Sequence, residues 1–193
     1  MYKTKENSKV AMYLALSYIG VYALDKVVFN GALYRIGSGK NFLDMEVYEW
    51  YRIITSSFLH LNAFHLLVNI FGIYFVSNIL ENRIGSQNFL IIYIIGNISS
   101  NVALSILSNF NGGIGPSPGI YALIACIIII HFKNNRLLNL RIEKWRVNYI
   151  IIYFLLGNIV GIFGVVGHIF GFAFGLIASL IYKTPYSDVQ MES

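Results

Sequence analysis

Five polar side chains in otherwise apolar stretches carry the groups that hydrolytic chemistry needs: His60, His65, Asn69, Ser117 and His168. Polar groups are costly in an apolar environment, so each is a candidate for function. A serine hydroxyl becomes a strong nucleophile when a histidine accepts its proton, and Ser117 with His168 offers that pair. Such chemistry also needs donors for a developing oxyanion, which the Ser117 N–H and the His65 and Asn69 side chains can supply.

Each of these residues also has a plain structural explanation. Ser117 can simply cap a helix, because serine is a preferred N-cap residue and Pro118 disfavours the α conformation before it. The histidines can be hydrogen-bonded interior residues or metal ligands. A metal site lacks a fourth ligand, and the five-residue spacing of His60 and His65 does not place both on one helix face. We therefore expect neither a metal nor another cofactor.

The composition is typical of a membrane protein. Of the 193 residues, 56% are hydrophobic and 12% are charged, whereas about 25% are charged in an ordinary soluble domain. The excess of 14 Lys and Arg over 9 Asp and Glu is small and forms no basic stripe, so we expect no nucleic-acid partner. The single cysteine, Cys126, has no partner for a disulfide or a cysteine zinc site and is interpreted as a packing residue.

Long stretches without charged residues predict the membrane helices, since a spanning helix needs about 20 mostly apolar residues. Turn formers at 109–118 divide the third such stretch, and glycines at 161–164 divide the fourth. The prediction is a single all-α domain over residues 1–193, with a core at about 48–183. Its six expected spans are residues 10–29, 60–80, 87–107, 118–132, 147–161 and 163–182.

The Lys and Arg residues of the loops predict the orientation. They gather in the amino-terminal tail and between the fourth and fifth spans, so we expect both termini in the cytoplasm. The loop of residues 30–59 then lies outside. The first span lacks a small-residue cleavage site before Asp25 and is expected to be retained rather than removed as a signal peptide.

Three of the candidate residues lie at a similar depth. Ser117, His168 and His65 precede the first charged residue of their cytoplasmic ends by 16, 15 and 16 positions. At about 1.5 Å per helical residue this is about 22–24 Å above the inner boundary, or about 6–8 Å below the outer surface of a core about 30 Å thick. No Asp or Glu occurs at this level on the same spans. The sequence thus predicts a Ser–His dyad and not a triad.

Glycine recurs every fourth residue on the last predicted span, at Gly167, Gly171 and Gly175. Small residues at this spacing leave a bare ridge on a helix. The pattern predicts that the backbone of another helix packs closely there.

Together these motifs resemble the rhomboid family of intramembrane serine proteases over about residues 48–180. In order along the chain, they are similar to a first-loop motif, an HxxxN pair, an ExR and GS pair, a GxS nucleophile region and an HxxGxxxG motif. Several motifs in the family's order are specific where each alone is weak. They are carried by Glu49-Trp50-Tyr51-Arg52, His60, His65, Asn69, Glu81, Arg83, Gly85, Ser86, Gly115-Pro116-Ser117, Tyr121, His168, Gly171 and Gly175.

The resemblance implies a six-helix bundle whose water-accessible cavity opens to the outside, and cleavage of single-span membrane proteins near their outer boundary. It implies Ser117 as the nucleophile and His168 as the general base and then acid. His65 and Asn69 would donate to the oxyanion, and the Tyr121 ring would pack against His168.

Supporting roles are implied for residues at both ends of the bundle. Trp50 and Arg52 would shape the interfacial first loop, which contacts lipid, while Glu81 and Arg83 would brace the cytoplasmic end. We expect an integral, multi-pass membrane protein of a bacterial cell membrane.

One departure from the family concerns the residue after the nucleophile. Glycine is usual there, but this chain has Pro118, with Gly119 one place later. Proline stiffens the backbone around the nucleophile but leaves the Ser117 N–H in place. The alternative function is therefore a catalytically impaired, rhomboid-like protein that binds transmembrane helices. A channel or transporter is disfavoured, because its polar residues would line a path through both leaflets.

Overall fold

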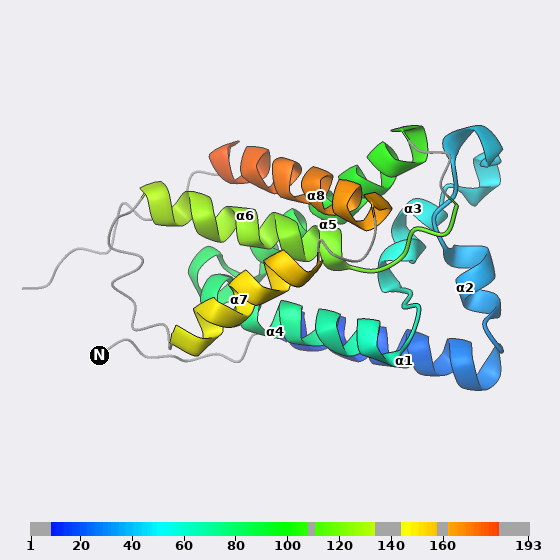
Figure 1. Cartoon of the computed structure of the whole chain (residues 1–193), viewed down its shortest axis with the longest axis horizontal. Coiled ribbons are helices and arrows are strands. Elements are labelled where there is room, and N and C mark those ends of the chain that lie inside the picture. Colours follow the sequence, from blue (N-terminus) through cyan, green and yellow to red (C-terminus); the bar gives the residue numbers. More distant parts are fainter. Residues whose placement is uncertain (1–8, 108–110, 134–143, 158–161, 182–193) are drawn as a thin grey trace, which may run out of the picture.

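The computed structural model describes residues 9–107, 111–133, 144–157 and 162–181, which form helices joined by turns. The longer helices lie roughly along one axis, and α7 is inclined to that axis (Figure 1). The longer elements are α1 (Lys9–Ala23, continued by the π-helical turn η1, Leu24–Val28), α4 (Ala63–Ile84), α5 (Ser86–Leu107), α6 (Ser117–Lys133), α7 (Lys144–Gly157) and α8 (Ile162–Ile181). The short elements between α1 and α4 are α2 (Ala32–Gly37), η2 (Phe42–Asp44), η3 (Val47–Glu49), α3 (Arg52–Thr55) and η4 (Ser56–Phe58).

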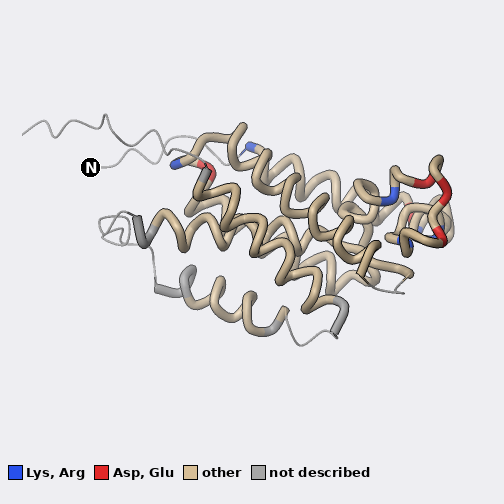
Figure 2. Tube along the Cα trace, turned by 90° about the horizontal axis from the view of Figure 1, so that it is seen from above, with Lys and Arg blue, Asp and Glu red and all other residues tan. Residues whose placement is uncertain are grey.

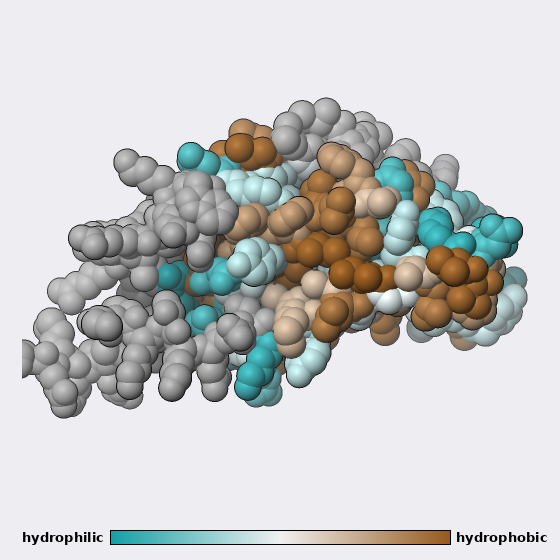
Figure 3. Space-filling view, turned by 90° about the horizontal axis from the view of Figure 1, so that it is seen from below, coloured by the Kyte–Doolittle hydropathy of each residue, from teal (hydrophilic) through white to brown (hydrophobic). Residues whose placement is uncertain are grey.

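The helices form an apolar bundle suited to a membrane. Three are long and apolar enough to cross one, namely Lys9–Val28, Ala63–Ile84 and Ser86–Leu107, whereas Ser117–Ile130 and Gly164–Leu180 are apolar but shorter. The charged residues of the described chain gather at the two ends of the bundle (Figure 2). Apolar residues form a band across the middle of the face drawn in Figure 3. These features indicate an integral membrane protein, and the count of six spans stays a prediction.

The second predicted span begins later than expected. The Asn62 side chain accepts the His65 N–H at 2.8 Å, which caps α4 and starts it at Ala63. The expectation that His60 lies on this helix is therefore wrong, because His60 is in the turn before it. At the other end, Gly85 stops the helix with φ +80°, a conformation that glycine adopts readily.

α6 lies in the middle of the bundle, packed against α8, α5 and α4, and includes the buried Cys126. Its contact with α8 depends on glycine. A Cβ on Gly171 would lie 2.8 Å from the Pro118 Cα, and a Cβ on Gly175 would lie 2.7 Å from the Ala122 carbonyl carbon. This is the close helix approach that the spacing of these glycines predicts, and it brings α8 against the first turns of α6.

α1 is attached to the rest of the bundle by polar contacts. The Glu81 carboxylate at the end of α4 accepts the Val10 N–H at 3.0 Å and the Ala11 N–H at 3.4 Å. A carboxylate at a helix N-terminus also interacts favourably with the helix dipole. Further along α1, the Tyr18 hydroxyl is hydrogen-bonded to the hydroxyl of Tyr93 on α5. Glu81 thus has a structural role, joining α1 to α4.

The first loop, residues 29–62, is organised around Glu49. The Glu49 Oε2 accepts from Lys40 Nζ at 2.6 Å and from the Glu46 N–H at 3.1 Å. Its Oε1 accepts from Arg52 at 2.8 Å and 3.0 Å. Arg52 also donates to the Ser38 carbonyl at 3.0 Å. One carboxylate therefore joins three segments of the loop.

Replacing Glu49 with glutamine is expected to destabilise the first loop at neutral pH but not in strong acid. The hydrogen bond from Lys40, with those from the Glu46 N–H and Arg52, lowers the pKa of Glu49 from 4.5 to about 2. Because the pKa is lowered on folding, the stabilisation is complete above pH 4.5 and disappears as the pH falls through about 2. Thermal unfolding in detergent across this pH range measures the effect as a Tm difference between parent and variant, which should shrink in acid.

Asp44→Asn is the control for this substitution, because Asp44 lies on the same loop and is exposed. Its Tm should follow that of the parent at every pH. A Glu49→Gln variant with the parent's Tm at neutral pH would contradict the role assigned to this carboxylate.

Candidate active site

Ser117 is the first residue of α6 and not its N-cap. The Pro116 carbonyl accepts the Ile120 N–H at 3.2 Å, so Pro116 occupies the capping position. The interpretation of Ser117 as an N-cap is therefore wrong by one residue. Pro118 is accommodated because a residue in the first turn of a helix has no intrahelical use for its N–H.

Ser117 and His168 come together from α6 and α8. The distance between Ser117 Oγ and His168 Nε2 is 2.9 Å, which is a hydrogen bond. His168 is buried and Ser117 is half-buried. The Tyr121 ring, one turn further along α6, stacks on the His168 ring with centroids 4.1 Å apart and planes 4° apart. In this geometry Nε2 can accept the proton of the Ser117 hydroxyl.

The described carboxylates have partners elsewhere. Those partners lie in the first loop, in the connection between α5 and α6, or at the N-terminus of α1. Asp25 accepts the Tyr34 N–H of the first loop, Glu46 accepts the Glu49 N–H, and Glu49 binds Lys40 and Arg52. Asp44 accepts from the Asn111 side chain, and Glu81 accepts from the first turn of α1. His168 is not among these partners, and the dyad stays a prediction.

His65 and Asn69 lie one turn apart on α4, next to the segment that precedes Ser117. Gly115 has φ +106°, and a Cβ there would lie 2.8 Å from the His65 ring and 3.9 Å from Asn69 Nδ2. Glycine is thus needed for the close approach of the His65 ring, whereas Asn69 is at an ordinary contact distance. Asn69 Nδ2 donates to the His65 carbonyl at 2.9 Å. An amide NH₂ carries two hydrogens, so Asn69 can keep this bond and still donate to an oxyanion.

Tyr153 on α7 is a site residue that the sequence analysis missed. Its hydroxyl donates to Asn69 Oδ1 at 3.1 Å. Because Oδ1 is the acceptor in this bond, the NH₂ group of Asn69 is the donor side. Tyr153 is buried, and a buried tyrosine hydroxyl usually has a hydrogen-bond partner. That rule could have singled out Tyr153 as a residue with a buried partner. The identity of the partner, Asn69, depends on the contact between α4 and α7.

His60 packs between His65 and Tyr18. It is 2% exposed, and its ring centroid lies 5.2 Å from that of His65 and 5.4 Å from that of Tyr18 on α1. Within the described residues, neither ring nitrogen has a hydrogen-bond partner. No group of three or more His, Cys, Asp or Glu in this part of the chain could hold a metal ion.

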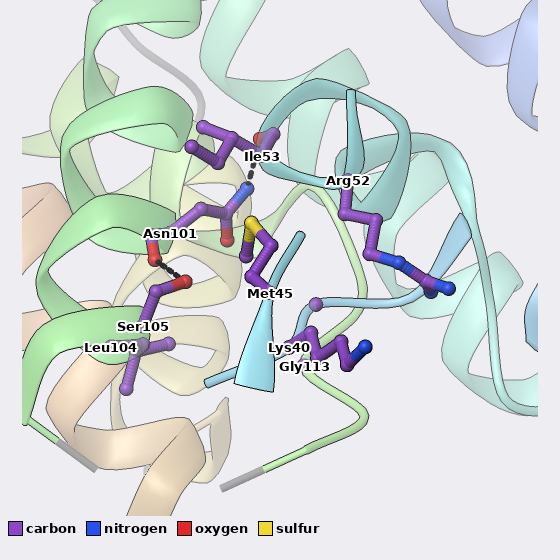
Figure 4. Close-up of a pocket in the computed structure, with 9 residues that line it drawn as sticks. Lys40, Met45, Arg52, Ile53, Asn101, Leu104, Ser105 and Gly113 are labelled. Carbon is purple, nitrogen blue, oxygen red and sulfur yellow. Dashed lines mark hydrogen bonds between the residues drawn. The ribbon is translucent and has the colours of Figure 1, made fainter. Parts of the chain in front are cut away.

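The remaining expected residues, Trp50 and Arg52, belong to the first loop, where Trp50 is exposed and Arg52 binds Glu49. A pocket lies between this loop and α5 and does not include the dyad (Figure 4). In the lining of this pocket, Asn101 Nδ2 donates to the Ile53 carbonyl at 2.7 Å, and this hydrogen bond joins the loop to α5. The pocket is lined by Gly39, Lys40, Met45, Arg52, Ile53, Asn101, Leu104, Ser105 and Gly113.

Comparison with known proteins agrees with this architecture. The rhomboid domain matches residues 47–185. The chain belongs to the rhomboid family. This rhomboid is 28% identical over 150 residues to human inactive rhomboid protein 2, covering 75% of this chain and 17% of that protein. It is 27% identical over 137 residues to the rhomboid protease GluP of Bacillus subtilis, covering 71% of this chain and 27% of GluP.

The matched part of this rhomboid spans 17% of the length of the human relative and 27% of the length of GluP. One relative is named inactive and the other a protease, so family membership by itself does not assign activity. The two come from human and from Bacillus subtilis. The family and the apolar helices indicate an integral membrane protein, whereas these relatives do not support the predicted bacterial origin.

Proposed function

We propose that this rhomboid is an intramembrane serine endopeptidase that cleaves single-span membrane proteins near the outer face of the membrane. The proposal is carried by the 2.9 Å distance between Ser117 Oγ and His168 Nε2. A serine hydroxyl bonded to an imidazole is the pair that base-assisted nucleophilic attack requires. The two residues are on different helices, so local helix structure does not require the contact.

The proposed reaction is acyl transfer followed by hydrolysis. The Ser117 Oγ attacks the carbonyl carbon of the substrate peptide bond while its proton passes to His168 Nε2. The Ser117 N–H and the His65 and Asn69 side chains donate to the resulting oxyanion. Collapse of this intermediate breaks the C–N bond, and His168 gives its proton to the leaving amine. His168 then takes a proton from water, whose oxygen attacks the acyl ester. When the second intermediate collapses, the bond between the acyl carbon and Ser117 Oγ breaks, His168 returns the proton to Ser117 Oγ, and the carboxylic acid product leaves.

The proposed topology has six membrane spans with both termini in the cytoplasm. In this orientation the first loop lies at the outer lipid boundary. Its aromatic side chains suit that position, because Phe42, Tyr48 and Trp50 are 51%, 77% and 52% exposed and aromatic rings favour the membrane interface. Substrates reach the dyad from the lipid, as transmembrane helices.

A second candidate is a rhomboid that binds transmembrane helices without cutting them. Two observations favour it: a similar human relative is named inactive, and Pro118 replaces the glycine usual after the nucleophile. The presence of both Ser117 and His168 supports the protease instead.

Labelling with a serine-directed fluorophosphonate separates these two functions. We expect the full chain in detergent to be labelled and Ser117→Ala to remain unlabelled, because the reagent reacts only with an activated hydroxyl. Thermal unfolding of both proteins serves as the folding control. A folded parent that does not react would favour the binding function, and equal labelling of the Ser117→Ala variant would contradict the assignment of Ser117.

A further inference from the structure

Ser117 is the midpoint of a five-residue segment that is attached on both sides through glycine amides. Two residues before it, the Gly115 N–H donates to the Ser56 carbonyl at 2.9 Å. Two residues after it, the Gly119 N–H donates to Asn97 Oδ1 at 3.1 Å. The first bond joins Ser117 to the first loop and the second joins it to α5.

The Asn97 side chain is itself held in one orientation. It is 3% exposed, and its Nδ2 donates to the Tyr93 carbonyl one turn back in α5 at 3.1 Å. Because the amide donates at one end and accepts at the other, a flip would break both bonds. Asn97 thus presents its oxygen to α6.

Because Pro118 lacks an N–H, the next residue, Gly119, donates the hydrogen bond from this turn to α5. The N–H groups at the start of a helix have no intrahelical acceptor, and the first intrahelical bond of α6 begins at Ile120. Pro118 has no N–H. The Gly119 N–H is therefore the donor that can orient the turn from outside, while the Ser117 N–H remains for an oxyanion.

The close approach of α5 also requires glycine at position 119. A Cβ there would lie 2.7 Å from the Tyr93 carbonyl oxygen and would also overlap Asn97. Proline at 118, glycine at 119 and Asn97 on α5 therefore depend on one another: Gly119 supplies the N–H and the space, and Asn97 supplies the acceptor. The sequence analysis did not single out Asn97, although the cost of a polar group in an apolar span applies to it as well.

We propose that Asn97 is a positioning residue for Ser117, which orients the first turn of α6 through the Gly119 N–H so that the Ser117 hydroxyl faces His168. This role rests on the proposed function, in which Ser117 is the nucleophile. Asn97 itself does not contact the reacting atoms.

The test compares Asn97→Leu, which removes the acceptor at similar size, with Asn97→Asp, which keeps an acceptor oxygen. A buried aspartic acid is expected to be protonated, so it can also donate to the Tyr93 carbonyl. The matched control is Asn78→Leu on α4, because Asn78 makes the same bond to the carbonyl one turn back, at 2.7 Å from Tyr74.

We expect Asn97→Leu to lower both kcat and the fluorophosphonate labelling rate by about 10- to 100-fold, as small displacements of reacting groups do. KM should stay unchanged. Asn97→Asp should recover most of the lost rate, and Asn78→Leu should label as fast as the parent. Asn97→Leu labelling at the parent rate, while Ser117→Ala does not label, would overturn the positioning role and leave the dyad standing. A rate loss that Asn97→Asp does not rescue would also overturn it.

A structure of the Asn97→Leu protein decides the proposal even when the parent is not labelled and the protease function fails. The distance between Ser117 Oγ and His168 Nε2, now 2.9 Å, should then exceed hydrogen-bonding range, which ends at about 3.2 Å. An unchanged distance would overturn the positioning role.

Discussion

Replacing Ser117 or His168 with alanine is expected to lower kcat by about 10⁴-fold or more, and replacing both is expected to lower it no further. The hydroxyl attacks well only when the imidazole 2.9 Å away takes its proton, so each residue contributes little without the other. Cleavage of a single-span substrate in liposomes by the two single variants and the double variant measures this coupling.

His131→Ala is the matched control, since it makes the same substitution near the far end of α6. It should keep the kcat of the parent. Losses that multiply in the double variant would contradict a shared dyad. Cleavage retained by either single variant would remove that residue from the mechanism.

Gly171→Ala is expected to destabilise the protein by about 1–3 kcal/mol, the usual cost of overpacking a core. The added Cβ would lie 2.8 Å from the Pro118 Cα. Backbone atoms cannot rotate aside as a side chain can, so α8 must move away from α6. His168 lies on α8 and Ser117 lies beside Pro118, and labelling of Ser117 should fall together with stability. Thermal unfolding and fluorophosphonate labelling of the same preparation measure both effects.

Gly164→Ala is the control on the same helix, because a Cβ at Gly164 meets nothing within 4 Å. Alanine favours a helix over glycine by about 1 kcal/mol, so this variant should be as stable as the parent or slightly more stable. Labelling should be unchanged. Equal destabilisation by both substitutions would show that the contact between α8 and Pro118 is not the cause.

Helix positions could be predicted well from the sequence where hydropathy and turn formers act locally. The sequence predicts the third span at residues 87–107, and α5 is Ser86–Leu107. It predicts the last span at 163–182, and α8 is Ile162–Ile181. Such boundaries follow from which residues tolerate an apolar environment and which break a helix, and both properties belong to the residues themselves.

The starts of α4 and α6 were less predictable, because a helix cap depends on which nearby atom makes the first bond. Asn62 caps α4 and so leaves His60 outside the helix. α6 begins at Ser117 itself, and the Ser117 hydroxyl is bonded to His168. Residue preferences place the start of a helix only to within one or two residues, and Pro116 is not among the residues preferred at an N-cap.

By itself the sequence determined an apolar helical chain, and it predicts one depth for Ser117, His65 and His168, since the rise per residue of a helix is nearly constant. Only the tertiary structure decided which faces of those helices meet. Helix rotation and tilt come from packing, such as glycine against backbone between α8 and α6. The same packing sets the partners of Asn69 and of the Gly119 N–H, which are Tyr153 and Asn97. These contacts join distant segments of the chain, and no local pattern of residues specifies them.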